Sequence, residues 1–243
     1  MWQALRSEVV DRGVEIVTVA LDTGGADAAR PHIEAAAPEH PSLIDAAHVC
    51  DELFGFVNVP NAVWIDEDGM IVRPAEAAFP GYSPVFDEIN RAADAADDVE
   101  LEVISRVAGF PMTAGTFGRS EMADLNRQIR TEPELYREMV LDWAEHGSAS
   151  RFALQPDEVV RRSAPRSPDV ARAAAHFELG QHLHRAGEPE AAVPHFREAH
   201  RLQPDNWTYK RQAWRFDPRA YDGNWVADVK EIGAENYYPP IQP

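Results

Sequence analysis

Residues 14–21 constrain the fold of this chain more than any other feature of its sequence. They read VEIVTVAL, β-branched and almost continuously apolar, which is typical of a strand buried on both faces of a sheet. Residues 2–12 carry apolar side chains at helical spacing and stop at Gly13, and residues 26–37 are again helical in pattern. A buried strand between two helices predicts a parallel α/β sheet.

Patterns downstream extend this sheet. The expected elements are a strand at 41–45, a helix at 46–54, strands at 62–66 and 70–73, and a helix at 83–96. Between the last two strands lies Glu67-Asp68-Gly69, a sequence typical of a tight hairpin turn. The sheet is therefore expected to end in a hairpin.

Strand patterns nearly vanish after residue 99, so the rest of the chain is predicted to be helical. The expected segments are 101–107 (helix or strand), a loop at 110–118, and helices at 122–129 and 132–145. Residues 151–169 contain Pro156, Pro165 and Pro168, which indicates a linker.

Charge and cysteine content exclude several classes of function. The formal net charge is −18, so no clustered positive face is expected and nucleic acid is not an expected partner. Cys50 is the single cysteine, which excludes an internal disulfide, a thiolate zinc cluster and a C-x-x-C pair. We expect no metal and no cofactor. The sequence has no apolar run long enough to span a bilayer and no signal segment, so the expected localisation is cytoplasmic.

Four motifs in one order resemble the TlpA/ResA type of thioredoxin-like proteins, a redoxin and AhpC/TSA-like group of thiol-disulfide oxidoreductases. The motifs are GVEIV from Gly13, PSLID from Pro41, FGFVNVP from Phe54 and WIDEDGMIV from Trp64. The resemblance covers about sixty residues. It implies an α/β fold, a thioredoxin-like sheet with flanking helices, followed by an all-α C-terminal region. The implied domains are 1–97 (thioredoxin-like), 98–167 (helical connecting region), 168–206 (helical hairpin) and 207–243 (irregular tail rich in Trp, Tyr and Pro).

The resemblance also implies a substrate-binding site at Val59 and Pro60. In the family, a cis proline opens a strand here, and an extended substrate segment pairs with the backbone of the preceding residue. The alternative is a trans proline in an ordinary turn.

The chain departs from the family at its catalytic motif. The family's cysteines lie at the start of the first helix, after a strand that sits between the strands at 14–21 and 62–66. Here that strand and the C-x-x-C motif are missing, and both would lie upstream of Met1. We therefore expect an N-terminally incomplete version of a longer protein, with a Cys or selenocysteine motif upstream, and a chain that alone is inactive.

Cys50 has two interpretations. It is a candidate redox residue, peroxidatic or resolving, near the strand that Pro60 opens. Alternatively it is an inert apolar residue of the helix at 46–54, because no basic residue lies near it in sequence to favour a thiolate.

Residues 177–204 resemble a tetratricopeptide repeat. The residues at the repeat's expected positions are Leu179, Gly180, Leu183, Gly187, Ala192, Phe196, Ala199 and Pro204. The hairpin either offers a peptide-binding groove or packs on neighbouring helices or the Trp-rich tail. Its five histidines match no zinc spacing and are expected to be solvated or capping residues; they are His176, His182, His184, His195 and His200.

Taken with the resemblance, these patterns lead to one expected function and one alternative. The first is a thiol-disulfide oxidoreductase or peroxidase whose redox motif lies upstream, with protein thiols, protein disulfides or a peroxide as substrate. The alternative is a non-catalytic thioredoxin-fold scaffold whose helical region binds a partner protein.

Overall fold

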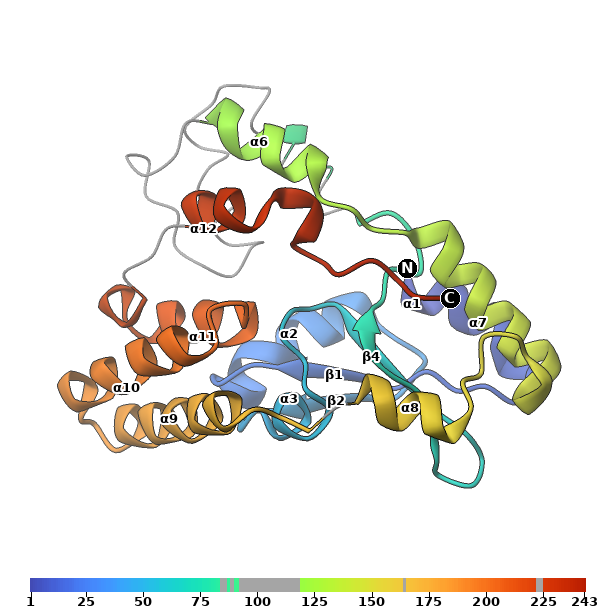
Figure 1. The fold of residues 1–243 in the computed structure, drawn as a ribbon, viewed down its shortest axis with the longest axis horizontal. Helices are drawn as coiled ribbons and strands as arrows, with labels where there is room; N and C mark the ends of the chain where they lie inside the picture. The colour runs from blue at the N-terminus through green and yellow to red at the C-terminus, as the bar shows by residue number, and fades with distance from the viewer. Residues whose placement is uncertain (84–86, 88–89, 92–118, 164, 222–224) are drawn as a thin grey trace. The chain divides into compact units, whose positions relative to one another are not determined.

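The computed structural model describes residues 1–83, 87, 90–91, 119–163, 165–221 and 225–243. It combines many helices with two small sheets (Figure 1), which confirms the α/β class. The expectations for 101–107 and 110–118 lie outside the described residues, as does most of the helix expected at 83–96.

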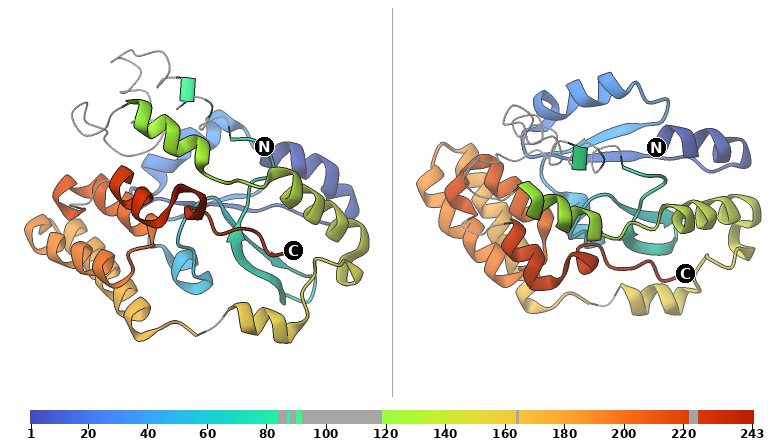
Figure 2. Two further views of the ribbon diagram at one scale, coloured as in Figure 1. Left: turned by 45° about the horizontal axis from the view of Figure 1, so that its top comes forward. Right: turned by 90° about the horizontal axis from the view of Figure 1, so that it is seen from above.

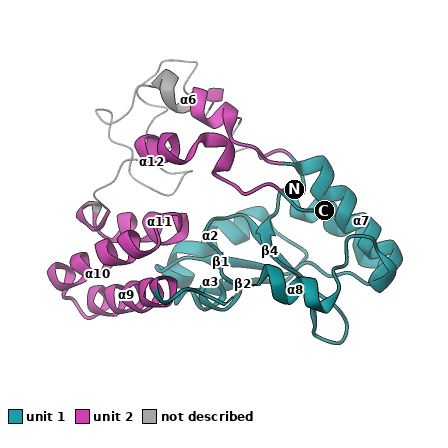
Figure 3. Ribbon diagram, viewed as in Figure 1, with its two compact units in different colours: residues 1–81, 132–168, 241–243 teal, residues 82–131, 169–240 magenta. Residues whose placement is uncertain are grey.

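The chain divides into two compact units (Figure 3). Unit 1 consists of Met1–Gly81, Glu132–Pro168 and Ile241–Pro243, and unit 2 of Tyr82–Thr131 and Asp169–Pro240. This division differs from the four consecutive segments expected, because residues 132–168 pack into the core of the first unit rather than connecting two domains.

Unit 1 follows the predicted order of helix, strand, helix, strand, helix and hairpin. Its elements are α1 Trp2–Val9, β1 Thr18–Leu21, α2 Gly25–Ala36, β2 Ser42–Asp45, α3 Val49–Phe54, β3 Asn61–Ile65, β4 Ile71–Ala77, α7 Pro133–His146 and α8 Pro156–Arg162. Gly13 ends the first helical segment in the left-handed conformation, with φ of 86°, as expected of a glycine at a helix stop.

The strands of unit 1 form two separate pairs. β1 pairs with β2 in parallel, Thr18 opposite Ser42, and β3 pairs with β4 in antiparallel, Asn61 opposite Ala77. Among the described residues, no strand joins β1 to β3.

The burial expected for residues 14–21 is wrong. Each residue of β1 is only half-buried, and the Val17 side chain is 51% exposed. The physical reason is that β1 has one strand neighbour in the described chain, so its second edge is uncovered.

The core of unit 1 joins its first helix to residues far along the chain. Leu5 and Val9 of α1 pack with Trp64 of β3 and with Tyr136 and Met139 of α7. Helices α1 and α7 lie side by side in each view (Figures 1 and 2).

The linker expected at 151–169 is also wrong, because α8 forms there and packs on β4. Pro156 occupies the first turn of α8, where a missing N–H costs nothing, and Val159 is buried. Leu154 N–H donates to the carbonyl of Val72 at 3.0 Å, which ties the segment to β4.

Unit 2 is helical in its described residues. Its helices are α6 Arg119–Gln128, α9 Pro168–Arg185, α10 Pro189–Leu202, α11 Trp207–Phe216 and α12 Trp225–Ile232. The helical hairpin predicted at 168–206 is confirmed as α9 and α10.

The hairpin packs on the Trp-rich segment, as one of its two interpretations predicted. Phe177 stacks on Tyr209 of α11 at 4.1 Å between ring centroids, and Phe196 stacks on Phe216 at 5.5 Å. The expectation of an irregular tail at 207–243 is therefore corrected. Tyr209 and Phe216 of α11 pack on the hairpin, and Trp225 of α12 packs on Tyr237, so aromatic packing stabilises helices that sequence periodicity did not reveal.

No helix in the described part of the chain is long and apolar enough to cross a membrane.

Candidate polypeptide-binding groove

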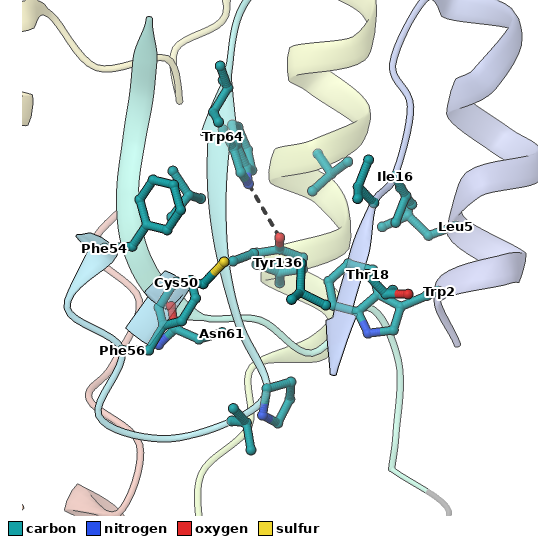
Figure 4. Close-up of a pocket in the computed structure, with 18 of the residues that line it drawn as sticks. Trp2, Leu5, Ile16, Thr18, Cys50, Phe54, Phe56, Asn61, Trp64 and Tyr136 are labelled. Atoms are coloured by element: carbon teal, nitrogen blue, oxygen red, sulfur yellow. Dashed lines mark hydrogen bonds between the residues drawn. The ribbon is translucent and has the colours of Figure 1, made fainter. Parts of the chain in front are cut away.

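A cavity of about 660 Å³ lies in unit 1 between the two strand pairs. We call it the inter-sheet groove. Figure 4 shows side chains that line it, from both β1 and β3 and from the helices beside them. Besides strand residues, the lining includes Trp2, Leu5, Cys50, Phe54, Phe56, Val59, Pro60, Tyr136, Val140 and Trp143.

Both walls of the groove are strand edges. Thr18 N–H donates to Pro41 O at 3.0 Å and Asp22 N–H to Asp45 O at 3.3 Å, so alternate residues of β1 bond toward β2. The peptide groups of Val17 and Val19 are therefore directed away from β2, and both residues line the groove. On the opposite wall, all five residues of β3 line it.

The groove leaves large apolar side chains exposed. Val17, Val59 and Ile65 are 51%, 38% and 47% exposed, and all three line the groove. Scattered exposed apolar residues are ordinary, but three that converge on one cavity between strand edges indicate a binding surface.

One polar atom in the groove has no hydrogen-bond partner. The Oδ1 atom of Asn61 is buried, and no described residue donates to it. An unsatisfied buried acceptor costs about 1–3 kcal/mol, so it is expected to receive an N–H from a bound segment.

The aromatic residues beside the groove form a packed cluster. Trp64 Nε1–H donates to the Tyr136 hydroxyl at 3.3 Å, and the Trp64 ring stacks on Trp143 at 4.9 Å. Trp2 meets Tyr136 edge to face at 6.1 Å. Burial raises the pKa of Tyr136, so its hydroxyl stays protonated.

The groove brings together all three site residues expected from sequence. Val59 and Pro60 line it just before β3, and the Val59–Pro60 peptide bond is cis. Cys50 comes to the same groove from α3. Sequence reasoning missed the contributions of Trp2, Tyr136 and Trp143, because no local pattern marks a helix residue that reaches a sheet more than sixty positions away.

The surroundings of Cys50 disfavour its thiolate. The pKa of the Cys50 thiol is raised, first by burial and then by the negative charges of Asp45 and Asp51. Asp45 is fixed close by, because its carboxylate accepts the N–H of Cys50 at 2.7 Å and of Ala47 at 3.2 Å. Cys50 is therefore a poor nucleophile at neutral pH, in line with the inert interpretation.

This account predicts the reactivity of Cys50. Asp45→Asn removes one of the charges that raise the Cys50 pKa, while the amide oxygen keeps an acceptor for the Cys50 N–H. Alkylation of Cys50 by iodoacetamide at pH 8 is expected to become roughly two- to fivefold faster, because a larger fraction is thiolate. Glu52→Gln is the control, with the same charge change two residues from Cys50 on an exposed side chain. Equal rates in the two variants would contradict the role of Asp45.

The histidines of the hairpin make contacts within unit 2. His176 Nδ1 and His195 Nδ1 lie 2.9 Å apart, the His184 ring packs on Phe216, and the His200 ring on Tyr221. In the part of the chain that the structure describes, no three His, Cys, Asp or Glu side chains are arranged to hold a metal ion.

Comparison of the chain with protein-family models, curated proteins and solved structures yields no match. The functional argument therefore depends on the groove itself.

Proposed function

We propose that unit 1 is a thioredoxin-like module that binds an extended polypeptide segment at the inter-sheet groove, with Val59 and Pro60 at the contact. The observation that carries this proposal is the convergence of these two residues, exposed apolar side chains and two strand edges on one cavity. Strand edges recognise extended chains through main-chain hydrogen bonds, and apolar pockets beside them select the side chains.

The proposed role is in thiol–disulfide exchange, with the redox motif supplied by residues outside the 243 of this sequence. In that reaction a thiolate attacks a substrate disulfide, a mixed disulfide forms and one substrate thiolate leaves. A second thiol of the motif then releases the reduced substrate, and the motif is oxidised to a disulfide. The raised pKa of Cys50 supports a nucleophile other than Cys50.

The alternative function is a non-catalytic scaffold that uses the same groove only for binding. The scaffold differs from the thiol–disulfide exchange function in one respect: a longer form of the protein would bind polypeptide but would not reduce disulfides. The hairpin supports a packing role in either case, because α11 already covers the Phe177 and Phe196 side chains.

Catalytic assays test the assignment of Cys50. We expect the 243-residue chain to show neither reduction of insulin disulfides nor turnover of hydrogen peroxide, and Cys50→Ser to behave like the parent in both assays. Peroxide turnover that is lost in Cys50→Ser would instead identify a Cys50 peroxidase.

A binding experiment tests whether the inter-sheet groove holds an extended polypeptide. The probe is fluorescein-labelled, reduced and carboxymethylated insulin B chain, an extended polypeptide without free thiols, followed by fluorescence anisotropy. Val59→Asp places a charge in the apolar groove and is expected to weaken binding about tenfold or more. Leu53→Asp is the matched control, because Leu53 is an exposed apolar residue of α3 that does not line the groove. Equal affinities of the two variants would exclude the groove as the binding site.

A further inference from the structure

We propose that His176 and His195 form a binding site for a divalent transition-metal ion of the Ni²⁺ or Cu²⁺ type, which links helices α9 and α10 of unit 2 (Figure 1). The inference goes beyond the proposed function, because both histidines belong to unit 2 and neither lines the inter-sheet groove. The expectation of no metal came from spacing along the chain. These two histidines are 19 residues apart on different helices, and they meet only in the tertiary structure.

The two imidazole rings face each other between the helices. The Nδ1 atoms of His176 and His195 lie 2.9 Å apart, and their ring centroids are 5.2 Å apart. When both rings are neutral, the Nδ1–H of one donates to the Nδ1 of the other. Neither ring makes another hydrogen bond to a described residue. An ion would therefore displace this one hydrogen bond, and the displaced hydrogen would move through solvent to Nε2 of its own ring.

The distance between the two nitrogens indicates the type of ion. Two imidazole nitrogens, each about 2.0–2.1 Å from an ion and at right angles around it, lie about 2.9 Å apart. At the tetrahedral angle they lie about 3.3 Å apart. The observed 2.9 Å fits adjacent positions on Ni²⁺ or Cu²⁺ better than a tetrahedral Zn²⁺ site. Both rings are half-buried, so a turn about χ2 can direct both lone pairs at one ion, and water completes its coordination.

The core of the hairpin holds the two histidines in place before an ion binds. His176 is followed by Phe177 and His195 by Phe196, and both phenylalanine side chains are fully buried. The two phenylalanine rings meet edge to face, with 5.7 Å between their centroids. The backbone beside each histidine is therefore fixed by packing. Ligands that are already positioned lose little entropy on binding, which favours binding of the ion.

The charged groups around the histidine pair are balanced. The Glu198 carboxylate lies close enough to His176 for the two side chains to interact electrostatically. Hydrogen bonds from Arg201 hold the pKa of Glu198 below its ordinary value, so this carboxylate is ionised at neutral pH. Arg172 acts on the same carboxylate and pairs with Asp169 at 3.1 Å. Two positive charges thus offset two negative ones, and the affinity for an ion comes chiefly from the two imidazole–metal bonds.

Calorimetric titration of the 243-residue chain, without a histidine tag, with NiCl₂ at pH 7.5 tests the site. We expect His176→Ala to weaken the tightest Ni²⁺ binding about tenfold or more, because a pair of ligands becomes a single one. His182→Ala is the matched control, since His182 is an exposed histidine of the same helix, and it should bind Ni²⁺ as the parent does. Equal Ni²⁺ affinities of the two variants would overturn the proposal.

A second variant separates the loss of a metal ligand from a loss of fold. His195→Gln keeps a hydrogen-bonding side chain opposite His176 but replaces an imidazole by an amide, which transition metals bind poorly. Its Tm without metal is expected to stay within error of the parent, while its Ni²⁺ affinity falls about tenfold or more. A His195→Gln variant that binds Ni²⁺ as tightly as the parent would exclude His195 as a ligand.

An ion that links two helices also stabilises the folded chain. With Ni²⁺ at ten times its Kd, the Tm of the parent is expected to rise by about 3–6 °C, because the unfolded chain does not hold the two histidines together. His176→Ala should show no such rise at the same Ni²⁺ concentration. An equal rise in both proteins would assign Ni²⁺ to other side chains. No rise in either would show that His176 and His195 share a hydrogen bond only, and both outcomes would overturn the proposal.

Discussion

Arg73→Met is expected to destabilise unit 1 by about 3–5 kcal/mol, the usual cost of removing one partner from a buried ion pair. Arg73 is fully buried in β4. Its Nε and Nη2 atoms donate to the two carboxylate oxygens of Glu76 at 2.7 and 2.9 Å. It also donates to the carbonyl oxygens of Phe152 at 2.9 Å and Gln242 at 2.6 Å. One side chain thus ties three segments of unit 1 together.

Methionine keeps most of the apolar stem of Arg73, so the loss of stability measured is chiefly that of the guanidinium and its five donors. It leaves the Glu76 carboxylate, whose side chain is 15% exposed, without a counter-charge, and two carbonyl groups without these donors. Calorimetry is expected to show a decrease in Tm of about 6–20 °C.

Arg161→Met is the matched control. Arg161 pairs with Glu158 through two bonds at the same spacing of three residues, but its side chain is 68% exposed. Its replacement is expected to leave Tm within error, because exposed pairs are well solvated. The double variant Arg73→Met/Glu76→Leu should recover much of the loss, since no unpaired charge remains. Similar Tm changes in Arg73→Met and Arg161→Met would show that burial of the Arg73–Glu76 pair does not contribute to the stability of unit 1.

Gly180→Leu is expected to destabilise unit 2 by about 3 kcal/mol, at the upper end for overpacking of a core. A Cβ atom at Gly180 would lie 2.8 Å from Cε1 and 2.9 Å from Cδ1 of Phe196, whose ring is fully buried. Leucine is a better helix former than glycine by nearly 1 kcal/mol, so helix propensity alone predicts the opposite sign.

Glu178→Leu introduces the same side chain on the exposed face of α9 and is expected to leave Tm nearly unchanged. The double variant Gly180→Leu/Phe196→Ala makes room for the new side chain. The decrease in its free energy of unfolding, measured by urea denaturation, should be smaller than the sum of the decreases in the two single variants by about 1 kcal/mol or more. Strictly additive losses would contradict the contact between Gly180 and Phe196.

The order of elements could be predicted because each depends on neighbours in sequence. The apolar spacing before Gly13, the β-branched run at 14–21 and the turn at Glu67-Asp68-Gly69 each determine local backbone geometry. The helical hairpin followed from Gly180 and Phe196, whose sizes are complementary across two helices. These local predictions were confirmed, although β1 and α3 are shorter than expected.

The two wrong predictions, a linker at 151–169 and an irregular tail at 207–243, share one physical origin, which is packing between distant residues. Prolines in 151–169 indicated a linker, yet α8 forms because it packs on β4, with Val159 buried and the Leu154 N–H bonded to the Val72 carbonyl just before the helix. Residues 207–243 showed little periodicity, yet α11 forms there because the hairpin covers the rings of Tyr209 and Phe216. Local pattern cannot show a partner that lies dozens of residues away.

The sequence by itself determined the α/β class of the first part and the helical hairpin, because short-range spacing and residue type decide these features. The family resemblance added Val59, Pro60 and Cys50 as candidate site residues, and all three line one groove. Only the tertiary structure decided that β1 and β3 stay unjoined among the described residues, that α7 lines the space between them, and that Cys50 lies beside Asp45. The reason is physical: strand pairing, burial and pKa depend on which groups meet through space, and the chain brings them together only when it folds.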